Sequence, residues 1–395
     1  MSYHGRFENQ KKPGNPQKLG SPKKGMNKGL KIFLIVLAVL LVLVAAAAVF
    51  AVSYYYKMMN KMNIVTLPKV TYTTEETVAP MTQPQTVETT MPVETETVET
   101  TRPPMSSDDI VNILVVGQAA REGEESHLAD TTMVVSLNTY TGEATIFSVL
   151  RDTAITSITY KDINGRTHTS GGVKFNTVYN NGYLWGGVVD AMAFTNAVML
   201  NDFGVEVDYN VEISFDSFIK LIDFMDGIDI ELTQAEADYL NKDDVWVTYD
   251  VAPGVQHLDG MAALCYARMR KAEGDSDSDI KRTSRQQKIL SALLEKVRYM
   301  SIPDLQNVAN TLLPLITTTM TPNDIASLTM KVLPLVRDLK ITTHTIPVEN
   351  EALEGSRWGE FVDIYGDGMQ HSIIRFDKNK NKKFIRAITE AEGIS

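Results

Sequence analysis

Charged residues are concentrated in the segment Tyr266–Gln287. Its sequence, YARMRKAEGDSDSDIKRTSRQQ, places arginines beside aspartates in a chain that is acidic as a whole. The arginines are Arg268, Arg270, Arg282 and Arg285. A guanidinium group offers phosphate oxygens a planar fork of donors and stays charged in a partly dry site. A solvated face of ion pairs is the common alternative for such a run. Because Arg268 and Arg270 follow the apolar run 262–267, which we expect to be buried, the segment favours a phosphate site.

Two further polar groups stand where predicted strands meet turns. The motif FSVLRDT places Arg151 and Asp152 at the end of one predicted strand, and LADTTMVVS places Asp130 before another. Ligands of open α/β sheets bind beyond strand ends, so the position of Arg151 favours function. An aspartate before a strand is more often a turn or cap residue. Residue type alone therefore assigns Asp130 no role.

The elements that must position these groups alternate between strand and helix. Apolar runs bounded by turn residues predict strands over 111–116, 131–137, 144–150, 209–213, 228–232 and 372–376. Helical spacing predicts helices over 188–201, 215–225, 283–300, 302–318 and 323–338, and a basic helix over 378–391. This order predicts an α/β fold with a central mixed β-sheet flanked by helices.

The amino-terminal part predicts a membrane anchor. Residues 1–31 form a basic tail in which Glu8 is the single acid, and Ile32–Val52 carries no charge. That length suits a transmembrane helix of about 20 residues. A cleaved signal peptide would have an apolar region of only about 7 to 15 residues. We therefore expect an anchor over 32–56. The excess of lysines before it places the amino terminus in the cytoplasm and the rest of the chain outside.

Composition divides the remaining chain in two. Thr, Glu, Val and Pro dominate the region after the anchor, which predicts an extended, disordered stalk over 57–107 and a folded domain over 108–395. The net charge is -11 and the sequence pI about 5.1, with the basic excess at one end, which disfavours nucleic acid as a partner. Cys265 is the one cysteine, and its apolar surroundings predict a buried hydrophobe rather than a nucleophile.

Taken together, six motifs resemble the LytR-CpsA-Psr family of cell-envelope proteins. They are NILVVG, ADTTM, SVLRD, KFNTVY with Gly186 and Gly187, LDGMAALCYARMR and DIKRTSRQQ, in the family's order between Asn112 and Gln287. The resemblance implies an α-β-α domain. It also implies a phosphotransferase that moves an undecaprenyl-pyrophosphate-linked glycopolymer, such as teichoic acid or capsule, onto peptidoglycan at the cytoplasmic membrane.

The resemblance also implies residue roles. The residues assigned to the pyrophosphate are Arg151, Arg268, Arg270, Arg282, Gln286 and Asn176. The catalytic set is Arg151, Asp279 and Arg282. Asp279 would accept a proton from the attacking sugar hydroxyl or orient Arg282. Asp130 would bind Mg²⁺, a hard ion that prefers carboxylate and phosphate oxygens. The long lipid would require an apolar groove, and the helices from Val188 and Phe215 and the one after Arg285 are candidate walls.

Three positions depart from the family pattern. Ala119, Leu128 and Leu150 stand where the family often has Asp, Arg and Pro. The metal site thus has one carboxylate fewer, and the phosphate site one cation fewer. Candidates to compensate are Glu122, Glu124, Glu125 and His127, and the other possibility is Mg²⁺ held by Asp130, water and substrate alone. These departures leave two alternatives open: a non-catalytic polyprenyl-phosphate-binding assembly or regulatory module, and a polyprenyl-pyrophosphate hydrolase.

Overall fold

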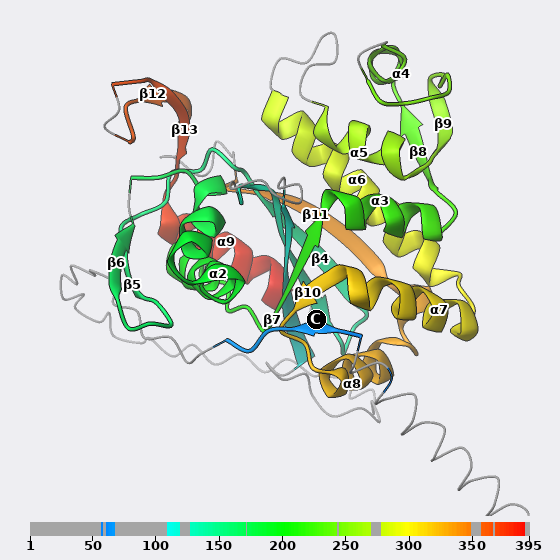
Figure 1. Cartoon of the computed structure of the whole chain (residues 1–395), viewed down its shortest axis with the longest axis horizontal. Helices are drawn as coiled ribbons and strands as arrows, with labels where there is room; N and C mark the ends of the chain where they lie inside the picture. Colours follow the sequence, from blue (N-terminus) through cyan, green and yellow to red (C-terminus); the bar gives the residue numbers. More distant parts are fainter. Residues whose placement is uncertain are drawn as a thin grey trace, which may run out of the picture. The chain divides into compact units, whose positions relative to one another are not determined.

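The computed structural model describes residues 57, 61–67, 109–118, 127–170, 172–242, 245–269, 278–348, 357–365 and 368–391. Within them lies a seven-stranded mixed sheet of order β1-β10-β7-β2-β3-β4-β11 (Figure 1). The strands span Asn63–Ile64 (β1), Ile316–Thr318 (β10), Tyr209–Ser214 (β7), Ile110–Gln118 (β2), Ala129–Asn138 (β3), Glu143–Val149 (β4) and Lys340–Ile346 (β11). The predicted central mixed sheet flanked by helices is confirmed.

Strand direction brings distant chain segments to one edge of the sheet. Strand β3 is antiparallel to both β2 and β4, whereas β2 pairs with β7, and β4 with β11, in parallel. The carboxyl ends of β2, β4, β7 and β11 therefore lie at the same edge as the beginning of β3. This edge is where the strand-end side chains of an α/β sheet meet a ligand.

Helices α2 (Asn176–Val198) and α9 (Lys378–Ala391) cover one face of the sheet (Figure 1). Buried side chains of β2, β4 and α2, such as Leu114, Phe147 and Phe194, form the core there. Helix α2 starts at Asn176, twelve residues before the predicted start at 188, and it is broken at Gly186 and Gly187. Gly187 has φ of 73°, and a Cβ on Gly186 would lie 1.7 Å from Asp190 Oδ2, so this kink requires both glycines.

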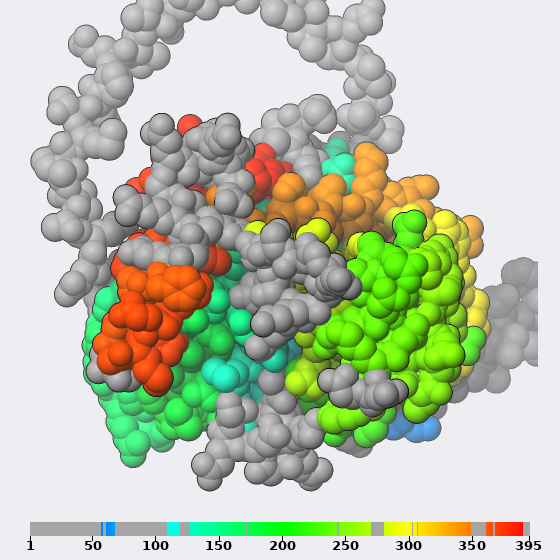
Figure 2. Space-filling model, turned by 90° about the horizontal axis from the view of Figure 1, so that it is seen from above, coloured from blue at the N-terminus to red at the C-terminus, as the bar shows by residue number. Residues whose placement is uncertain are grey.

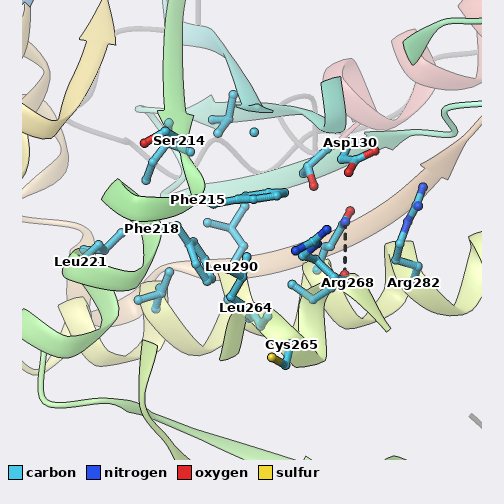
Figure 3. Close-up of a pocket in the computed structure, with 18 of the residues that line it drawn as sticks. Asp130, Ser214, Phe215, Phe218, Leu221, Leu264, Cys265, Arg268, Arg282 and Leu290 are labelled. Carbon is cyan, nitrogen blue, oxygen red and sulfur yellow. Dashed lines mark hydrogen bonds between the residues drawn. The ribbon is translucent and has the colours of Figure 1, made fainter. Parts of the chain in front are cut away.

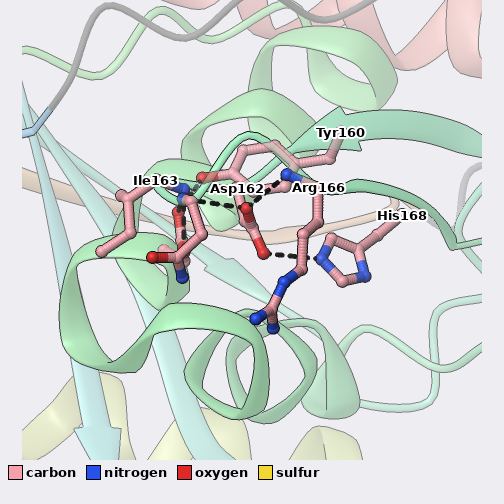
Figure 4. Close-up of polar contacts among 7 residues, drawn as sticks. Tyr160, Asp162, Ile163, Arg166 and His168 are labelled. Atoms are coloured by element: carbon pink, nitrogen blue, oxygen red, sulfur yellow. Dashed lines mark hydrogen bonds and ion pairs between the residues drawn. The ribbon is translucent and has the colours of Figure 1, made fainter.

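The kink allows Asp190 to hold the hairpin of β5 (Ile158–Lys161) and β6 (Thr167–Ser170) against α2. Figure 4 shows Tyr160, Ile163 and His168 of this hairpin. The Tyr160 hydroxyl donates to Asp190 Oδ1 over 2.6 Å, and the Ile163 amide donates to the same atom over 3.1 Å. His168 Nε2 lies 2.9 Å from Asp162 Oδ2 within the hairpin. Asp190 is fully buried, and these donors satisfy its carboxylate.

A second group of elements packs on the opposite face. It comprises α3 (Phe215–Phe224), β8 (Ile228–Leu232), α4 (Gln234–Leu240), β9 (Gly254–Leu258), α5 (Gly260–Arg268) and α6 (Ser278–Arg298). These elements share a core that includes Ile222, Leu258 and Tyr266. Side-chain caps fix where three of the helices begin: Ser214 caps α3, Thr233 caps α4 in a capping box with Glu236, and Asp259 caps α5.

The later part of the chain departs from the helical expectation. Helices α7 (Ile302–Leu312) and α8 (Pro322–Val332) are present, but Ile316–Thr318 is strand β10 rather than the end of a helix. Pro314 cannot continue α7, and the β-branched run after it suits a strand. Lys340–Ile346 forms the unpredicted strand β11. Strand β12 (Arg357–Val362) pairs with β13 (His371–Arg375) in a separate hairpin.

Before residue 109, the structure describes residue 57 and the segment 61–67. Strand β1 pairs with β10, and the Val65 amide donates to Thr318 O over 2.9 Å. Segment 61–67 therefore belongs to the folded domain, although the sequence places it in the stalk. The tail 1–31, the anchor 32–56 and the stalk beyond residue 67 lie outside the described residues. Among the residues that are described, none of the helices has the length and apolar character to span a bilayer.

Candidate functional site

A pocket of about 820 Å³ lies against the sheet edge, walled by α3, α5 and α6 (Figure 3). Figure 3 shows Asp130, Arg268 and Arg282 at one end and the apolar side chains of α3 at the other. The polar lining is Asp130, Arg268, Arg282 and Gln286, with Thr131 and Ser214 beside them. The apolar lining includes Ile213, Phe215, Phe218, Leu221, Leu264, Ile289, Leu290 and Leu293. One cavity thus joins a charged end to an apolar interior.

A β-bulge directs Asp130 into this pocket. Strand β3 pairs Thr131 with Gly117, but the next pair along β2 is Gln118 with Ala129, so Asp130 is the extra residue. Neighbouring residues of a regular strand point to opposite faces, yet Asp130 and Thr131 both line the pocket. The bulge removes that alternation locally. The sequence contains no signal for it, since a one-residue bulge does not alter the apolar pattern of the strand.

Arg268 is the last residue of α5, and its guanidinium lies over the Phe215 ring, 4.8 Å from the ring centroid. This cation–π contact joins the end of α5 to the start of α3. A guanidinium group stacked in this way has fewer conformations to lose when an anion binds. The contact also marks the boundary between the charged end of the pocket and the apolar wall that Phe215 begins.

One face of α6 supplies the opposite wall. Arg282, Gln286, Ile289 and Leu293 follow each other at helical spacing, and all of them line the pocket. Arg282 is buried, with only 4% of its surface exposed. Gln287, on the adjoining face of the helix, donates from Nε2 to Ser148 Oγ over 2.9 Å and to His344 O over 3.1 Å. These bonds fix α6 against β4 and β11, and so fix the height of Arg282 above the sheet edge.

Arg285 belongs to the same arginine cluster in the sequence but has a different surrounding. Its Nε donates to Glu236 Oε1 over 2.8 Å and its Nη1 to Met269 O over 3.0 Å, and both charged side chains are buried. Burial disfavours the ionised carboxyl of Glu236, but hydrogen bonds from the Thr233 amide and from Arg285 outweigh burial and lower its pKa. Arg285 thus joins α6 to α4 and lies outside the pocket lining.

Arg151 and Asn176 lie at the same sheet edge but are not among the pocket-lining residues. The Asn176 amide donates to Arg151 O over 3.1 Å, so the first turn of α2 holds the turn after β4. Asp152 Oδ1 lies 3.7 Å from Arg151 Nε and 3.0 Å from Lys174 Nζ. The structure therefore brings Asn176 to the backbone of Arg151 rather than into the cavity.

Other predicted residues lie wholly or partly outside the described part. Arg270 falls in the segment 270–277, and Ala119 and the three candidate glutamates fall in 119–126. Asp279 is in the first turn of α6, and its side chain is not described. Its two predicted roles both remain predictions.

His127 packs on α2 instead of reaching the pocket. Its amide donates to Asn180 Oδ1 over 2.9 Å, and its ring is stacked on Tyr183 with centroids 3.4 Å apart. Burial lowers the pKa of His127, which favours the neutral ring. On the same helix face the Tyr179 hydroxyl donates to Glu212 of β7. Helical spacing at 176, 179, 180 and 183 marks this polar stripe, but the helix predicted from sequence begins only at 188 and does not include it.

The number of carboxylates in the pocket limits how a metal ion could be held there. In the described part of the chain, no group of three or more His, Cys, Asp or Glu side chains is placed to hold an ion. Asp130 brings one carboxylate to the charged end of the pocket. Magnesium is commonly held through one or two carboxylates together with substrate phosphates and water. Asp130 therefore fits a Mg²⁺ ion held mainly by substrate and water.

Comparison with known proteins identifies relatives with this architecture. The chain matches the LytR_cpsA_psr family over residues 57–363. TagU of Bacillus anthracis (strain CDC 684), named a polyisoprenyl-teichoic acid–peptidoglycan teichoic acid transferase, is 28% identical over 49% of this chain and 54% of that protein. TagT of Bacillus subtilis (strain 168), named for the same activity, is 29% identical over 52% of this chain and 58% of that protein. The chain thus spans a little more than half of the length of these relatives.

Solved structures share the fold. A structure described as TagT bound to LI-WTA has a TM-score of 0.51 and 20% identity, and the match covers 75% of this chain and 95% of that chain. A crystal structure of Bacillus subtilis TagV has a TM-score of 0.51 and 22% identity, covering 73% of this chain and 98% of that chain. At these identities the likeness establishes the fold.

Proposed function

Since the chain belongs to the LytR-CpsA-Psr family, we propose that it is a phosphotransferase that moves an undecaprenyl-pyrophosphate-linked anionic glycopolymer onto peptidoglycan. The observation that carries this proposal is the pocket whose charged end, with Arg268 and Arg282, continues into an apolar interior. A polyprenyl pyrophosphate has the same division between head and tail. The relatives named as teichoic acid transferases support this class of substrate.

The apolar interior suits the lipid. Phe215, Phe218, Leu264 and Leu290 come from three helices that enclose the cavity. Each methylene transferred from water to such surroundings contributes about 0.8 kcal/mol. The predicted wall formed by the helix from Phe215 and the helix after Arg285 coincides with this cavity. The helix from Val188 packs on the opposite face of the sheet.

In the proposed reaction, a sugar hydroxyl of peptidoglycan attacks the phosphorus that carries the glycopolymer. A new P–O bond forms to peptidoglycan, the P–O bond to the lipid phosphate breaks, and undecaprenyl phosphate leaves with the electron pair. Negative charge grows on the leaving phosphate, and Arg268 and Arg282 stabilise it from the pocket wall. Gln286 Nε2 donates to Ala267 O over 3.5 Å, which keeps its amide near the same phosphates. Asp279 accepts the hydroxyl proton or orients Arg282.

Asp130 is the residue that would hold Mg²⁺, and the ion would supply further neutralisation of phosphate oxygens. Arg151, at the neighbouring strand end, and Arg270 would extend the cationic surface toward the polymer. The enzyme would act outside the cytoplasmic membrane, anchored by residues 32–56 with its amino terminus in the cytoplasm.

A second candidate function is a non-catalytic module that retains polyprenyl phosphate. The observation that favours it is the small number of charged groups in the site. Asp130 is the one carboxylate among the described lining residues, and Leu128 stands two positions before it, where the family often has an arginine. In that case lipid phosphate would bind, but Mg²⁺ would alter neither affinity nor turnover. Hydrolysis, with water in place of the sugar hydroxyl, is the related enzymatic alternative.

The test combines full-length protein in detergent with a lipid-pyrophosphate-linked glycopolymer, peptidoglycan and Mg²⁺. We expect polymer to become linked to peptidoglycan with release of undecaprenyl phosphate, and chelation of the metal to suppress both. Release without linkage would indicate the hydrolase. If neither transfer nor pyrophosphate cleavage occurs while the lipid still binds, the enzymatic proposal is wrong and the binding module stands.

Cys265 provides an independent probe of lipid in the pocket. Cys265 is one of the residues that line the cavity, and burial raises the pKa of its thiol, so slow alkylation is expected near neutral pH. We expect undecaprenyl phosphate to slow alkylation by iodoacetamide at least tenfold, because the tail would cover the sulfur. Mass spectrometry of the modified peptide measures the rate. Unchanged alkylation at lipid concentrations that saturate binding would place the tail elsewhere.

A further inference from the structure

Helix α9 is anchored along one side and carries basic residues along the other. Asn381 is fully buried, and its Oδ1 accepts a hydrogen bond of 2.9 Å from the Val348 amide. Phe384, Ile385 and Ile388 pack into the core that α2 forms with the sheet. The orientation of the helix relative to the sheet is therefore fixed.

The outer side of α9 concentrates positive charge in an acidic protein. We use the term α9 cationic face for Arg375, Lys380, Lys382, Lys383 and Arg386. Arg375, Lys383 and Arg386 are exposed, and Lys380 and Lys382 flank them. Two acids lie at the start of the helix: Asp377 Oδ1 accepts from the Lys380 amide over 3.0 Å, and Asp202 pairs with Lys378. This concentration of charge contrasts with the overall net charge of -11.

The α9 cationic face begins at the edge of the sheet that carries Arg151. The Ile374 amide donates to Asp152 O over 2.8 Å, and Ile374 O accepts from the Ala154 amide over 2.9 Å. Arg375 therefore comes directly after Ile374, which is hydrogen-bonded to the turn after β4. From there α9 continues on the face of the sheet that α2 covers, away from α3, α5 and α6 (Figure 1). The lipid pocket and the α9 cationic face therefore extend from the strand-end edge along opposite faces of the sheet.

The view from above agrees with this arrangement. Figure 2 shows the α2 side, with the β12–β13 hairpin upon it, and the lobe of α4 and β9 as two masses, with the cyan end of β2 between them. A donor whose lipid occupies the pocket and whose pyrophosphate lies at Arg268 and Arg282 must direct its glycan out of the pocket. Arg375 of β13 and the basic side chains of α9 line a path from that edge.

We propose that the α9 cationic face binds the phosphodiester backbone of the donor glycopolymer. The proposal rests on the proposed transferase function and assigns a binding surface to the repeated negative charges of its anionic polymer. Lysine and arginine side chains bind successive phosphates through charge-assisted hydrogen bonds and released counterions. An uncharged glycan would gain nothing from these side chains. Anionic lipid head groups would share the phosphate chemistry, and the vesicle measurement below distinguishes them from the polymer.

The test uses full-length protein in detergent and the double variant K383Q/R386Q. The matched control is K331Q/R337Q, which removes one exposed lysine and one exposed arginine from α8 and the turn after it, at the far end of the domain in Figure 1. The probe is lipid-free poly(glycerol phosphate), with uncharged dextran of similar length as the comparison. We expect K383Q/R386Q to weaken poly(glycerol phosphate) binding about fivefold at low salt, as for two exposed ion pairs. The control variant should bind like the wild type.

Donor length supplies the second readout. With a lipid-linked polymer of many phosphodiesters, K383Q/R386Q should raise KM by a similar factor and leave kcat unchanged, and added salt should remove the difference. With a lipid-pyrophosphate disaccharide, the variant and the wild type should have equal KM. Equal polymer binding by wild type and K383Q/R386Q would overturn the proposal. So would a loss confined to binding of anionic phospholipid vesicles, which would assign the α9 cationic face to the membrane.

This experiment separates the two proposals. Binding of poly(glycerol phosphate) requires no turnover, so it tests α9 even if the chain transfers nothing. If the wild type fails to process the short donor, the proposed transferase function fails, whatever the polymer measurement shows.

Discussion

The substitution Arg282→Ala should lower kcat for transfer roughly 100- to 1,000-fold, the range for removal of one group that stabilises transition-state charge. Arg282 is buried in the pocket wall and comes from a helix fixed to β4 and β11 through Gln287. Arg282→Lys should recover part of the rate, because it keeps the charge but loses the planar fork.

The measurement is kcat and KM for release of undecaprenyl phosphate by full-length protein. Lys281→Ala is the control, since Lys281 is the exposed neighbour of Arg282 on the same helix. Thermal unfolding of each variant should show that the fold persists. A kcat within threefold of wild type for a folded Arg282→Ala protein would remove Arg282 from the mechanism.

The substitution Arg285→Ala should cost stability rather than chemistry, by about 3 to 5 kcal/mol, because it leaves the buried carboxylate of Glu236 without its partner. The pair Arg285→Met with Glu236→Gln should regain much of this loss, since no charge then stays buried and the side-chain oxygen can still accept from the Thr233 amide. Urea unfolding measures both, with Lys281→Ala as the exposed control on α6. A loss below 1 kcal/mol for the single variant would contradict a structural role for this pair.

The same pair predicts a dependence on pH. The pKa of Glu236 is lower in the folded protein than in the unfolded chain. Its contribution is therefore complete above the unfolded pKa and is lost as pH falls through the folded pKa. Below about pH 4.5, near the ordinary pKa of a glutamate, the wild type should lose stability faster than a Glu236→Gln variant.

The main strands and helices were readable from sequence because long apolar runs and helical spacing determine them. Strands β2, β3, β4 and β7 and helix α3 lie where the pattern predicts. Strands β1, β10 and β11 were missed because each is short or lies at the sheet border, and their partners are distant in the chain. Pairing of β10 with β7, about a hundred residues away, leaves no local trace.

In the site too, some positions follow from local spacing in the sequence, whereas others depend on residues far apart in the chain. Sequence spacing puts Arg282 and Gln286 on one face of α6, but the neighbouring Arg285 faces a different partner. Nothing near residue 285 indicates Glu236, which lies 49 positions earlier. Likewise, Asp130 reaches the pocket through a bulge that only strand pairing reveals. Residue type identifies the candidate residues. Tertiary contacts separate residues that line the pocket, such as Arg282, from residues that join its supporting helices, such as Arg285.

A crystal structure of the protein with undecaprenyl pyrophosphate tests the central claim most directly. We predict the diphosphate beside Arg268 and Arg282, with the tail running between Phe218 and Leu290 into the interior of the pocket. A lipid bound on another surface, or a diphosphate remote from both arginines, would contradict the account.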